Sequence, residues 1–298
     1  MKFGYSIPNN QGVENPNDLV ALAVKAEQLG FSSVWVAEHL FHSSYVAERL
    51  GDKPYHEALT VLTAIACSTK TVRLGTSVLV LPWHDPARLG KMIATLDQLS
   101  GGRVDLGVGV ALTEDEFKNL GVDFASRGRR ANEVLGAMQA LWTQDTPKFS
   151  GEFYNYEGLK FSPKPVQKPY PPILVGGASK PAYRRIAQYG DGWHTIRQSP
   201  TQVAAARTQI IQLTRDAGRD ATNLRFSINL HYRVSEAASD IPVQDRITLA
   251  GNTNDIIETI QAYKAAGIDE IIINATSPDM NRHGEIMSHF TESVQPKL

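Results

Sequence analysis

Residues 72–110, VRLGTSVLVLPWHDPARLGKMIATLDQLSGGRVDLGVGV, say more about the fold of this chain than any other stretch. They predict a strand, a loop, a helix, a two-glycine turn and a second strand, which make one βαβ unit. Asp85 and Pro86 are a typical start for the helix, because aspartate caps free backbone amides and proline fits the first turn. Gly101 and Gly102 end the helix. The unit indicates parallel strands that are joined by helices.

Small residues interrupt both strands of this unit at places where bulky apolar residues would pack better. Gly75, Thr76 and Ser77 break the apolar run of the first strand, and the second strand finishes in Gly107 and Gly109. Glycine inside a strand usually marks a bulge, or the close approach of a ligand or of another stretch of backbone. We therefore expect a ligand to lie near the carboxyl ends of these two strands.

Strand and helix patterns alternate from one end of the chain to the other. Eight short apolar strands are expected, at residues 3–7, 34–37, 72–80, the run ending at 109, 173–175, 192–196, 224–234 and 271–275. Nearly continuous apolar strands are typical of parallel sheets that helices cover on both faces. The helix–glycine–strand pattern of residues 29–34 recurs at residues 266–271. We predict an α/β fold of the (β/α)8 barrel type, forming one domain over residues 1–298.

Three segments lie outside this alternation. Residues 40–56 look like a long irregular loop, residues 149–161 predict a small β-hairpin, and the proline-rich residues 163–172 predict a rigid connector. An open Rossmann sheet is the alternative fold. It should show GxGxxG after its first strand, and residues 7–10 (Ile-Pro-Asn-Asn) offer no such motif.

Composition indicates an ordinary globular protein. The net charge is -1, so nothing points to binding of nucleic acid or of an acidic membrane surface. We see no signal-peptide pattern and no apolar run long enough to span a membrane. The single cysteine, Cys67, excludes an internal disulfide, and its apolar helix face predicts a buried structural thiol. We expect a cytoplasmic protein.

The carboxyl ends of barrel strands are where catalytic groups gather. Glu38 and His39 are the only acid–imidazole pair at such an end. Histidine can donate or accept a proton near neutral pH, and a neighbouring carboxylate can orient it. The simpler alternative is a capping carboxylate beside a hydrogen-bonded histidine. His194 and His231 also lie near strand ends, where a packing role is the more ordinary interpretation.

Residues 176–179, Gly-Gly-Ala-Ser, end one strand and open a helix. Bare glycine amides at a helix N-terminus form an anion site that suits a phosphate group. Paired glycines are weak evidence alone, and Ser179 could simply cap the helix. We find no sequence pattern for a metal site, a serine nucleophile elbow or a Schiff-base lysine. A barrel with a phosphate site and none of these groups indicates an organic cofactor.

In several blocks the chain resembles the luciferase-like monooxygenase superfamily of flavin- and deazaflavin-dependent oxidoreductases. The blocks are AEQLGFSSVWVAEH, TVRLGTSVLVLP, ATLDQLSGGRVDLGVGV, RGRRANEVLGAMQALW, FSGEFY and PVQKPYPPILVGGAS with YGDGW. They occur in the family's order, cover nearly all of the chain up to Gly192 and resume at residues 251–275. Several independent blocks in order are a far more specific signal than a single glycine motif.

The resemblance implies a (β/α)8 barrel with a cofactor across the carboxyl ends of the strands. It favours the deazaflavin coenzyme F420, with flavin mononucleotide (FMN) as the alternative. F420 moves hydride and scarcely activates oxygen, so it implies hydride transfer to or from a small organic substrate. Reduced FMN would instead oxygenate a substrate with O2 and would need a flavin reductase as partner. The remaining alternative is a barrel that binds flavin without catalysis. Dimers are common in the family, so the resemblance also implies a possible homodimer.

Individual residues follow from the same resemblance. The F420 branch typically has a non-prolyl cis peptide in the bulge of its third strand, and the matching bond here is Ser77–Val78. His39 matches a histidine that works beside the hydride-transfer centre of an F420-dependent sugar-phosphate dehydrogenase, and Glu38 stands in place of an aspartate. Val110 replaces a glutamate of that enzyme, which argues against the same sugar substrate. The expected cofactor-binding residues are Thr76, Ser77, Val78, Gly107, Gly109, Gly176, Gly177, Ala178 and Ser179.

The substrate is not specified by any motif in the loops that should line the pocket. Phe41, Tyr45, Tyr55 and Trp83 are compatible with an aromatic-walled pocket, although aromatic residues in loops are as often packing residues.

Overall fold

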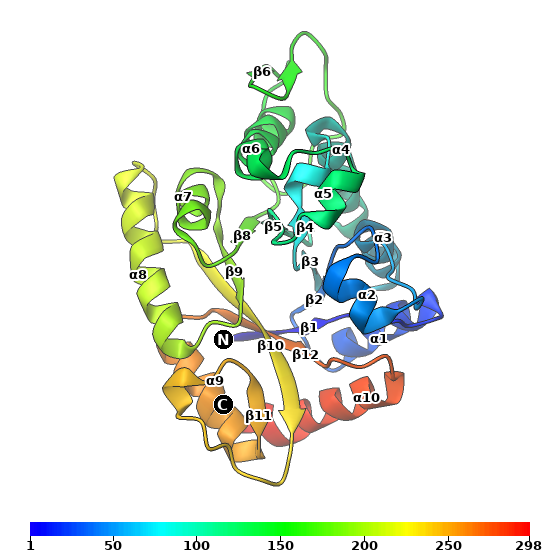
Figure 1. Ribbon diagram of the computed structural model, residues 1–298, viewed down its shortest axis with the longest axis vertical. Helices are drawn as coiled ribbons and strands as arrows, with labels where there is room; N and C mark the ends of the chain where they lie inside the picture. Colours follow the sequence, from blue (N-terminus) through cyan, green and yellow to red (C-terminus); the bar gives the residue numbers. More distant parts are fainter.

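The computed structural model describes the backbone of residues 1–298 and all side chains apart from that of Ser44. Its central feature is a closed barrel of parallel strands, which confirms the predicted (β/α)8 fold (Figure 1). Around the barrel the strands are β1 (Lys2–Ser6), β2 (Ser33–Val36), β3 (Arg73–Thr76), β5 (Val104–Gly109), β8 (Ile173–Gly176), β9 (Gly192–Ile196), β10 (Arg225–Val234) and β12 (Glu270–Asn274). The pairing of β12 with β1 closes the ring.

A long helix follows each barrel strand and covers the outside of the sheet (Figure 1). These helices are α1 (Pro16–Gln28), α3 (Ala58–Ser68), α4 (Pro86–Ser100), α6 (Arg127–Thr143), α7 (Lys180–Tyr189), α8 (Pro200–Asp216), α9 (Thr253–Ala265) and α10 (Met280–His289). Asp85 caps α4 by accepting from the amides of Ala87 and Arg88, as the sequence predicted. Gly101, with φ +67°, ends that helix in the left-handed conformation that glycine tolerates best.

A bulge lies between β3 and the two-residue strand β4 (Leu79–Val80). Gly75 pairs with Asp105 of β5, whereas Leu79 pairs with Val108. The four steps along β3 and β4 are therefore matched by three steps along β5, so the first strand carries one extra residue. The extra length pushes Ser77 and Val78 out of the wall of the barrel. Ser77–Val78 is a cis peptide bond, as the family resemblance implied.

Trp35 fills the interior of the barrel and is fully buried. A Cβ atom on Gly75 would lie 2.2 Å from its indole ring, and one on Gly4 would lie 2.9 Å from its Nε1 atom. Gly75 is therefore small because Trp35 needs the space, so no ligand is required to explain it.

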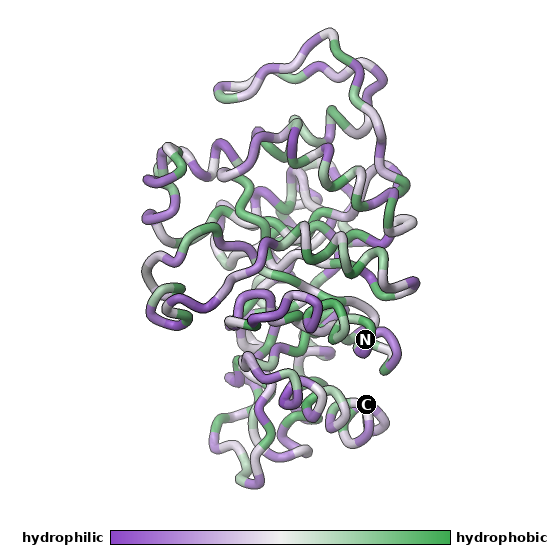
Figure 2. Tube along the Cα trace, turned by 90° about the vertical axis from the view of Figure 1, so that its right-hand side faces the viewer, coloured by the Kyte–Doolittle hydropathy of each residue, from purple (hydrophilic) through white to green (hydrophobic). Residues whose placement is uncertain are grey.

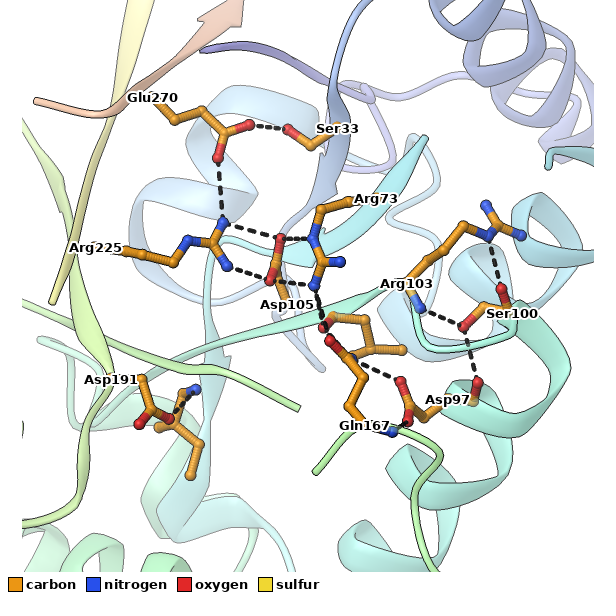
Figure 3. A network of polar contacts seen from close by, with 12 residues as sticks. Ser33, Arg73, Asp97, Ser100, Arg103, Asp105, Gln167, Asp191, Arg225 and Glu270 are labelled. Carbon is orange, nitrogen blue, oxygen red and sulfur yellow. Dashed lines mark hydrogen bonds and ion pairs between the residues drawn. The ribbon is translucent and has the colours of Figure 1, made fainter. Parts of the chain in front are cut away.

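An ion-pair network closes the amino end of the barrel, where it joins the first residues of several strands (Figure 3). The Asp105 carboxylate is fully buried and accepts hydrogen bonds from Arg73 and Arg225, with N–O distances down to 2.7 and 2.6 Å. Burial alone would raise the pKa of Asp105, but the two guanidinium groups lower it. Arg225 also lies 3.6 Å from Glu270, which accepts a hydrogen bond from Ser33. The network stabilises the end of the barrel opposite the expected site.

The connections contain short elements, some of which the sequence analysis missed. The expected hairpin is present as β6 (Phe149–Ser150) and β7 (Asn155–Tyr156), and its segment projects from the barrel in Figures 1 and 2. Residues 40–56 were predicted as a loop but contain a helix, α2 (Ser44–Leu50). The remaining elements are α5 (Asp115–Asn119), β11 (Leu249–Gly251), the 3-10 turns Leu81–Trp83, Phe124–Ser126, Val243–Asp245 and Gln295–Lys297, and a π-helical turn at Phe290–Val294.

The prediction of a buried cysteine was wrong. Cys67 is exposed, because it lies on the outward face of α3 while its neighbours Ile65 and Ala66 face the core. Within the described residues, no helix is long and apolar enough to cross a lipid bilayer.

Candidate functional site

Val78 lies at the mouth of the barrel, between two glycines of neighbouring strands. A Cβ atom on Gly109 would come within 2.7 Å of its Cγ2 atom, and one on Gly176 within 3.3 Å of its Cγ1 atom. Ser77 and Val78 are partly exposed there, whereas Thr76 before them and Leu79 after them are buried. The bulge thus presents two residues to the mouth, and glycines hold the space that their side chains need.

Gly107 has a different part in the same arrangement. A Cβ atom there would lie only 1.8 Å from the backbone oxygen of Thr76, so no larger residue fits beside the bulge. The Thr76 hydroxyl donates to the carbonyl of Gly107 at 2.7 Å and is itself buried. Thr76 and Gly107 were expected to contact a cofactor directly. Their contacts within the protein fix the backbone of the bulge, and direct contact with a cofactor stays a prediction.

The four residues 176–179 lie beside this bulge at the start of α7. Gly177 adopts φ +98°, a conformation that glycine tolerates far better than other residues. Residues 177–179 are exposed, and the Ser179 hydroxyl caps α7 by accepting from the amide of Ala182 at 3.4 Å. A Gly-Gly turn and a capped helix N-terminus thus lie at the strand end where the sequence analysis expects a phosphate group, and phosphate binding there stays a prediction.

His39 lies just beyond β2 and is held between two side chains from the loops. Its Nδ1 atom is 2.5 Å from the carboxylate of Glu116 on α5, and its Nε2 atom is 2.6 Å from the hydroxyl of Tyr45 on α2. Glu116 is fully buried and also accepts from the amides of Leu40 and Phe41. Burial alone would raise the pKa of Glu116, but these hydrogen bonds lower it. Because an ionised carboxylate only accepts, we infer that Nδ1 carries the imidazole proton and that Nε2 accepts from the Tyr45 hydroxyl.

Glu38 does not have the role that the sequence analysis gave it. Its carboxylate accepts from the amide of Val80 at 2.6 Å and lies 2.8 Å from Nε2 of His84. Burial alone would lower the pKa of His84, but the hydrogen bond and negative charge of Glu38 raise it. Glu38 therefore anchors the strand after the bulge, and the carboxylate that holds His39 is Glu116.

His194 supports the bulge from inside the barrel. Its Nε2 atom is 2.8 Å from the Ser77 hydroxyl, its Nδ1 atom is 2.8 Å from the Ser227 hydroxyl, and its ring stacks on Trp35 with centroids 4.6 Å apart. Burial, followed by the charge of Arg225, lowers its pKa to about 3. His194 is thus a neutral packing residue, as expected. His231 forms a hydrogen bond with Thr276 at 2.7 Å and makes no contact with His39 that the structure records.

Two aromatic side chains next to His39 contain polar atoms without a protein partner. The rings of Tyr55 and Trp83 lie 5.8 and 6.0 Å from the His39 ring. The Tyr55 hydroxyl and the Trp83 Nε1 atom are buried and form no hydrogen bond. Unpaired buried donors are unusual in native proteins and call for an explanation, for which a bound water or a bound ligand would serve.

Sequence reasoning missed Glu116 and named Tyr45 only as a possible wall of the pocket, not as a partner of His39. Both lie in loops that contain no recognisable motif, and they reach His39 across 77 and 6 positions of the chain respectively. The only available signal was composition: the run Thr-Glu-Asp-Glu at residues 113–116 supplies acids close to a strand end.

Comparison with known proteins shows the family of the chain. Residues 1–244 match the family model described as luciferase-like monooxygenase. The chain belongs to the luciferase-like monooxygenase family. The F420-dependent glucose-6-phosphate dehydrogenase of Amycolatopsis mediterranei is 29% identical over all of this chain and 98% of its own. The FMNH2-dependent dimethylsulfone monooxygenase of Pseudomonas putida is 28% identical over 99% of this chain and 80% of its own.

Solved structures of luciferase-like proteins share the same fold. An F420-dependent secondary alcohol dehydrogenase, solved with an F420–acetone adduct, superposes with a TM-score of 0.80 at 21% identity, over 99% of this chain and 98% of its own. A monooxygenase from Streptomyces bottropensis gives a TM-score of 0.84 at 22% identity, over 100% of this chain and 99% of its own. Luciferase-like relatives of this chain are thus oxidoreductases that use either F420 or reduced FMN.

Proposed function

We propose that this protein is an F420-dependent oxidoreductase that transfers hydride to or from a small organic substrate at the mouth of the barrel. The observation that carries the proposal is the Glu116–His39 pair, which leaves an oriented imidazole nitrogen at that mouth. Hydride transfer at a carbon that bears oxygen requires that a proton leave or join that oxygen. An oriented histidine can accept or donate this proton. Whole-chain similarity to an F420-dependent dehydrogenase supports the choice of cofactor.

The residues at the mouth fit a flat ring joined to a phosphate. The bulge at Ser77 and Val78 is partly exposed and would back the ring, with Gly109 and Gly176 leaving the space that Val78 requires. The exposed residues Gly177–Ser179 at the start of α7 would hold the phosphate. When bound, the deazaflavin supplies the carbon that takes up or releases hydride.

His39 moves the proton in this proposal. Glu116 holds Nδ1 as the donor, so Nε2, which contacts the Tyr45 hydroxyl in this structure, is the nitrogen that would accept the substrate proton. Glu38 contributes indirectly, because it fixes the backbone amide of Val80 behind the bulge. Thr76 and Gly107 likewise act by shaping the bulge. Ala178 completes the phosphate turn.

A reduced-FMN monooxygenase is the second candidate, and similarity to the dimethylsulfone monooxygenase favours it. This function would require O2 and a flavin reductase partner. We further propose that the protein acts in the cytoplasm as a homodimer. The single cysteine and the net charge of -1 are compatible with a reducing, intracellular compartment.

Replacement of His39 tests the proposed role. His39→Ala should lower the rate of F420 reduction by a panel of small alcohols by roughly 10²-fold or more, because general-base catalysis contributes that much. The affinity for F420 should change little, since the bulge and the phosphate turn remain. His42→Ala, an exposed neighbour that bonds to the Gly51 carbonyl, is the matched control. Unchanged turnover in His39→Ala would exclude the role.

A further inference from the structure

The Tyr45 hydroxyl contacts Nε2 of His39, the nitrogen that accepts the substrate proton in the proposed function. That hydroxyl lies 2.6 Å from Nε2 of His39, which is the distance of a strong O–H···N hydrogen bond. Burial raises the pKa of Tyr45, while Arg49 and Arg197 oppose the shift, so the phenol stays protonated and acts as the donor. A neutral hydroxyl that donates to Nε2 is also what an alcohol substrate would present there.

Two buried polar atoms lie on the aromatic side chains that flank His39. The Tyr55 hydroxyl and the Trp83 Nε1 atom are shielded from solvent and have no protein partner. An unpaired buried donor is destabilising, and a ligand hydroxyl that accepts from it would remove that cost. Both rings border the His39 ring, so two buried donors without a protein partner belong to side chains that flank the histidine contacted by Tyr45.

The Tyr45 side chain can move away from His39 while helix α2 stays folded. Helix α2 has seven residues and is anchored by Val46 and Leu50, whose side chains are buried. The Tyr45 side chain is 49% exposed on the other face. A change of its side-chain rotamer would free Nε2 of His39 while Val46 and Leu50 stay packed.

We propose that the Tyr45 hydroxyl occupies the position of a substrate hydroxyl, and that this subsite takes a small neutral hydroxyl compound. Tyr45 then acts as a gate: a substrate hydroxyl displaces the phenol from His39 and gains Tyr55 and Trp83 as further hydrogen-bond donors. The inference rests on the proposed function in taking His39 as the acceptor of the substrate proton. It predicts that the subsite exists in the protein without any cofactor.

Nitrogen NMR of the cofactor-free, full-length protein tests the gate. The probe is 2-propanol, and the readout is the 15N chemical shift of His39 Nε2, identified by its loss in His39→Gln. In the wild type we expect a hydrogen-bonded shift that hardly responds to 2-propanol. In Tyr45→Phe, which keeps the ring and removes the hydroxyl, the shift should move toward the unbonded value and return as 2-propanol is added. Glu48→Gln, an exposed change on the same helix, should behave as the wild type.

Phenol binding is a second measurement of the same proposal. Tyr45→Ala should leave a space that phenol fills, with apparent affinity at least about tenfold higher than in the wild type. Thermal melting checks that both variants are folded. An unchanged His39 shift in Tyr45→Phe, or equal phenol binding by Tyr45→Ala and wild type, would overturn the proposal. Because no cofactor is present, these results are independent of whether F420 or FMN is the true cofactor.

Discussion

At the scale of single residues, the protein depends on how one histidine is held. Glu116 is buried, accepts three hydrogen bonds and fixes His39 with Nδ1 protonated. This arrangement resembles the acid–histidine part of a catalytic triad, in which the carboxylate sets tautomer and orientation and stays ionised. Glu116 is therefore a positioning residue in our account.

Glu116→Gln should lower kcat at least about tenfold while the affinity for cofactor remains. The glutamine amide can donate to Nδ1, which places the imidazole proton on Nε2 and removes the acceptor. Nitrogen NMR of His39 reports this change of tautomer directly. Glu114→Gln, an exposed neighbour, is the control and should leave both kcat and tautomer unchanged. A normal tautomer together with normal kcat in Glu116→Gln would exclude the positioning role.

The sequence analysis paired His39 with Glu38, but the carboxylate that contacts His39 is Glu116. Glu38 is adjacent in the chain, yet successive side chains at a strand end point in opposite directions, and Glu38 turns to Val80 and His84. Glu116 comes from a loop with no regular pattern, so only the folded chain brings it to His39. The roles of Val78 and Gly109 could be predicted better, because glycines at strand ends are visible in the sequence.

At the scale of elements, the bulge between β3 and β4 organises the mouth of the barrel. Gly107→Ala should destabilise the fold, since its Cβ atom would lie 1.8 Å from the Thr76 backbone oxygen. Overpacking of this kind costs about 1–3 kcal/mol, which urea unfolding can measure. Affinity for the cofactor should fall as well, because the bulge must shift.

Gly90→Ala is the matched control for the bulge. Gly90 lies inside α4, and a Cβ atom there would meet only ordinary contacts at 3.6 Å or more. This variant should be as stable as the wild type or slightly more stable, because alanine is the better helix former. Equal stability and cofactor affinity of the Gly107 and Gly90 variants would contradict the account of the bulge.

His194 should make the stability of the folded protein depend on pH. The unfolded chain binds a proton at His194 near pH 6.5, but the folded protein binds it only near pH 3. Stability should therefore decrease as pH falls from 6.5 toward 3, by at most roughly 1.4 kcal/mol per pH unit from this group. Urea unfolding of the wild type and His194→Gln across this window should show a shallower slope in the variant. Parallel slopes would contradict the assignment of a neutral His194.

At the scale of the whole molecule, the barrel separates stability from function at its two ends. The network of Asp105, Arg73 and Arg225 joins β3, β5 and β10 at the amino end (Figure 3). Asp105→Asn should destabilise the fold by about 3–5 kcal/mol, because two partly buried guanidinium groups lose the buried anion that they share. Asp145→Asn, an exposed change, is the control. Thermal and urea unfolding measure the difference, and a loss below 1 kcal/mol would show that the network is dispensable.

The barrel itself was predictable because its signal is repeated eight times along the chain. Alternating apolar strands and capped helices leave few other solutions, and an error in one element does not alter the rest. Helix α2 and Cys67 were mispredicted because each depends on local packing rather than on a repeated pattern. The site lies between these cases: its strand ends were predictable, but the loops that complete it were not.

The central claim is that the mouth of this barrel binds F420 for hydride transfer. The most direct measurement is a parallel titration of the purified protein with F420 and with FMN, followed by the quenching of cofactor fluorescence. Our account predicts saturable F420 binding at least about tenfold tighter than FMN binding, and its loss in Gly107→Ala. Tight binding of FMN with no measurable binding of F420 would contradict it.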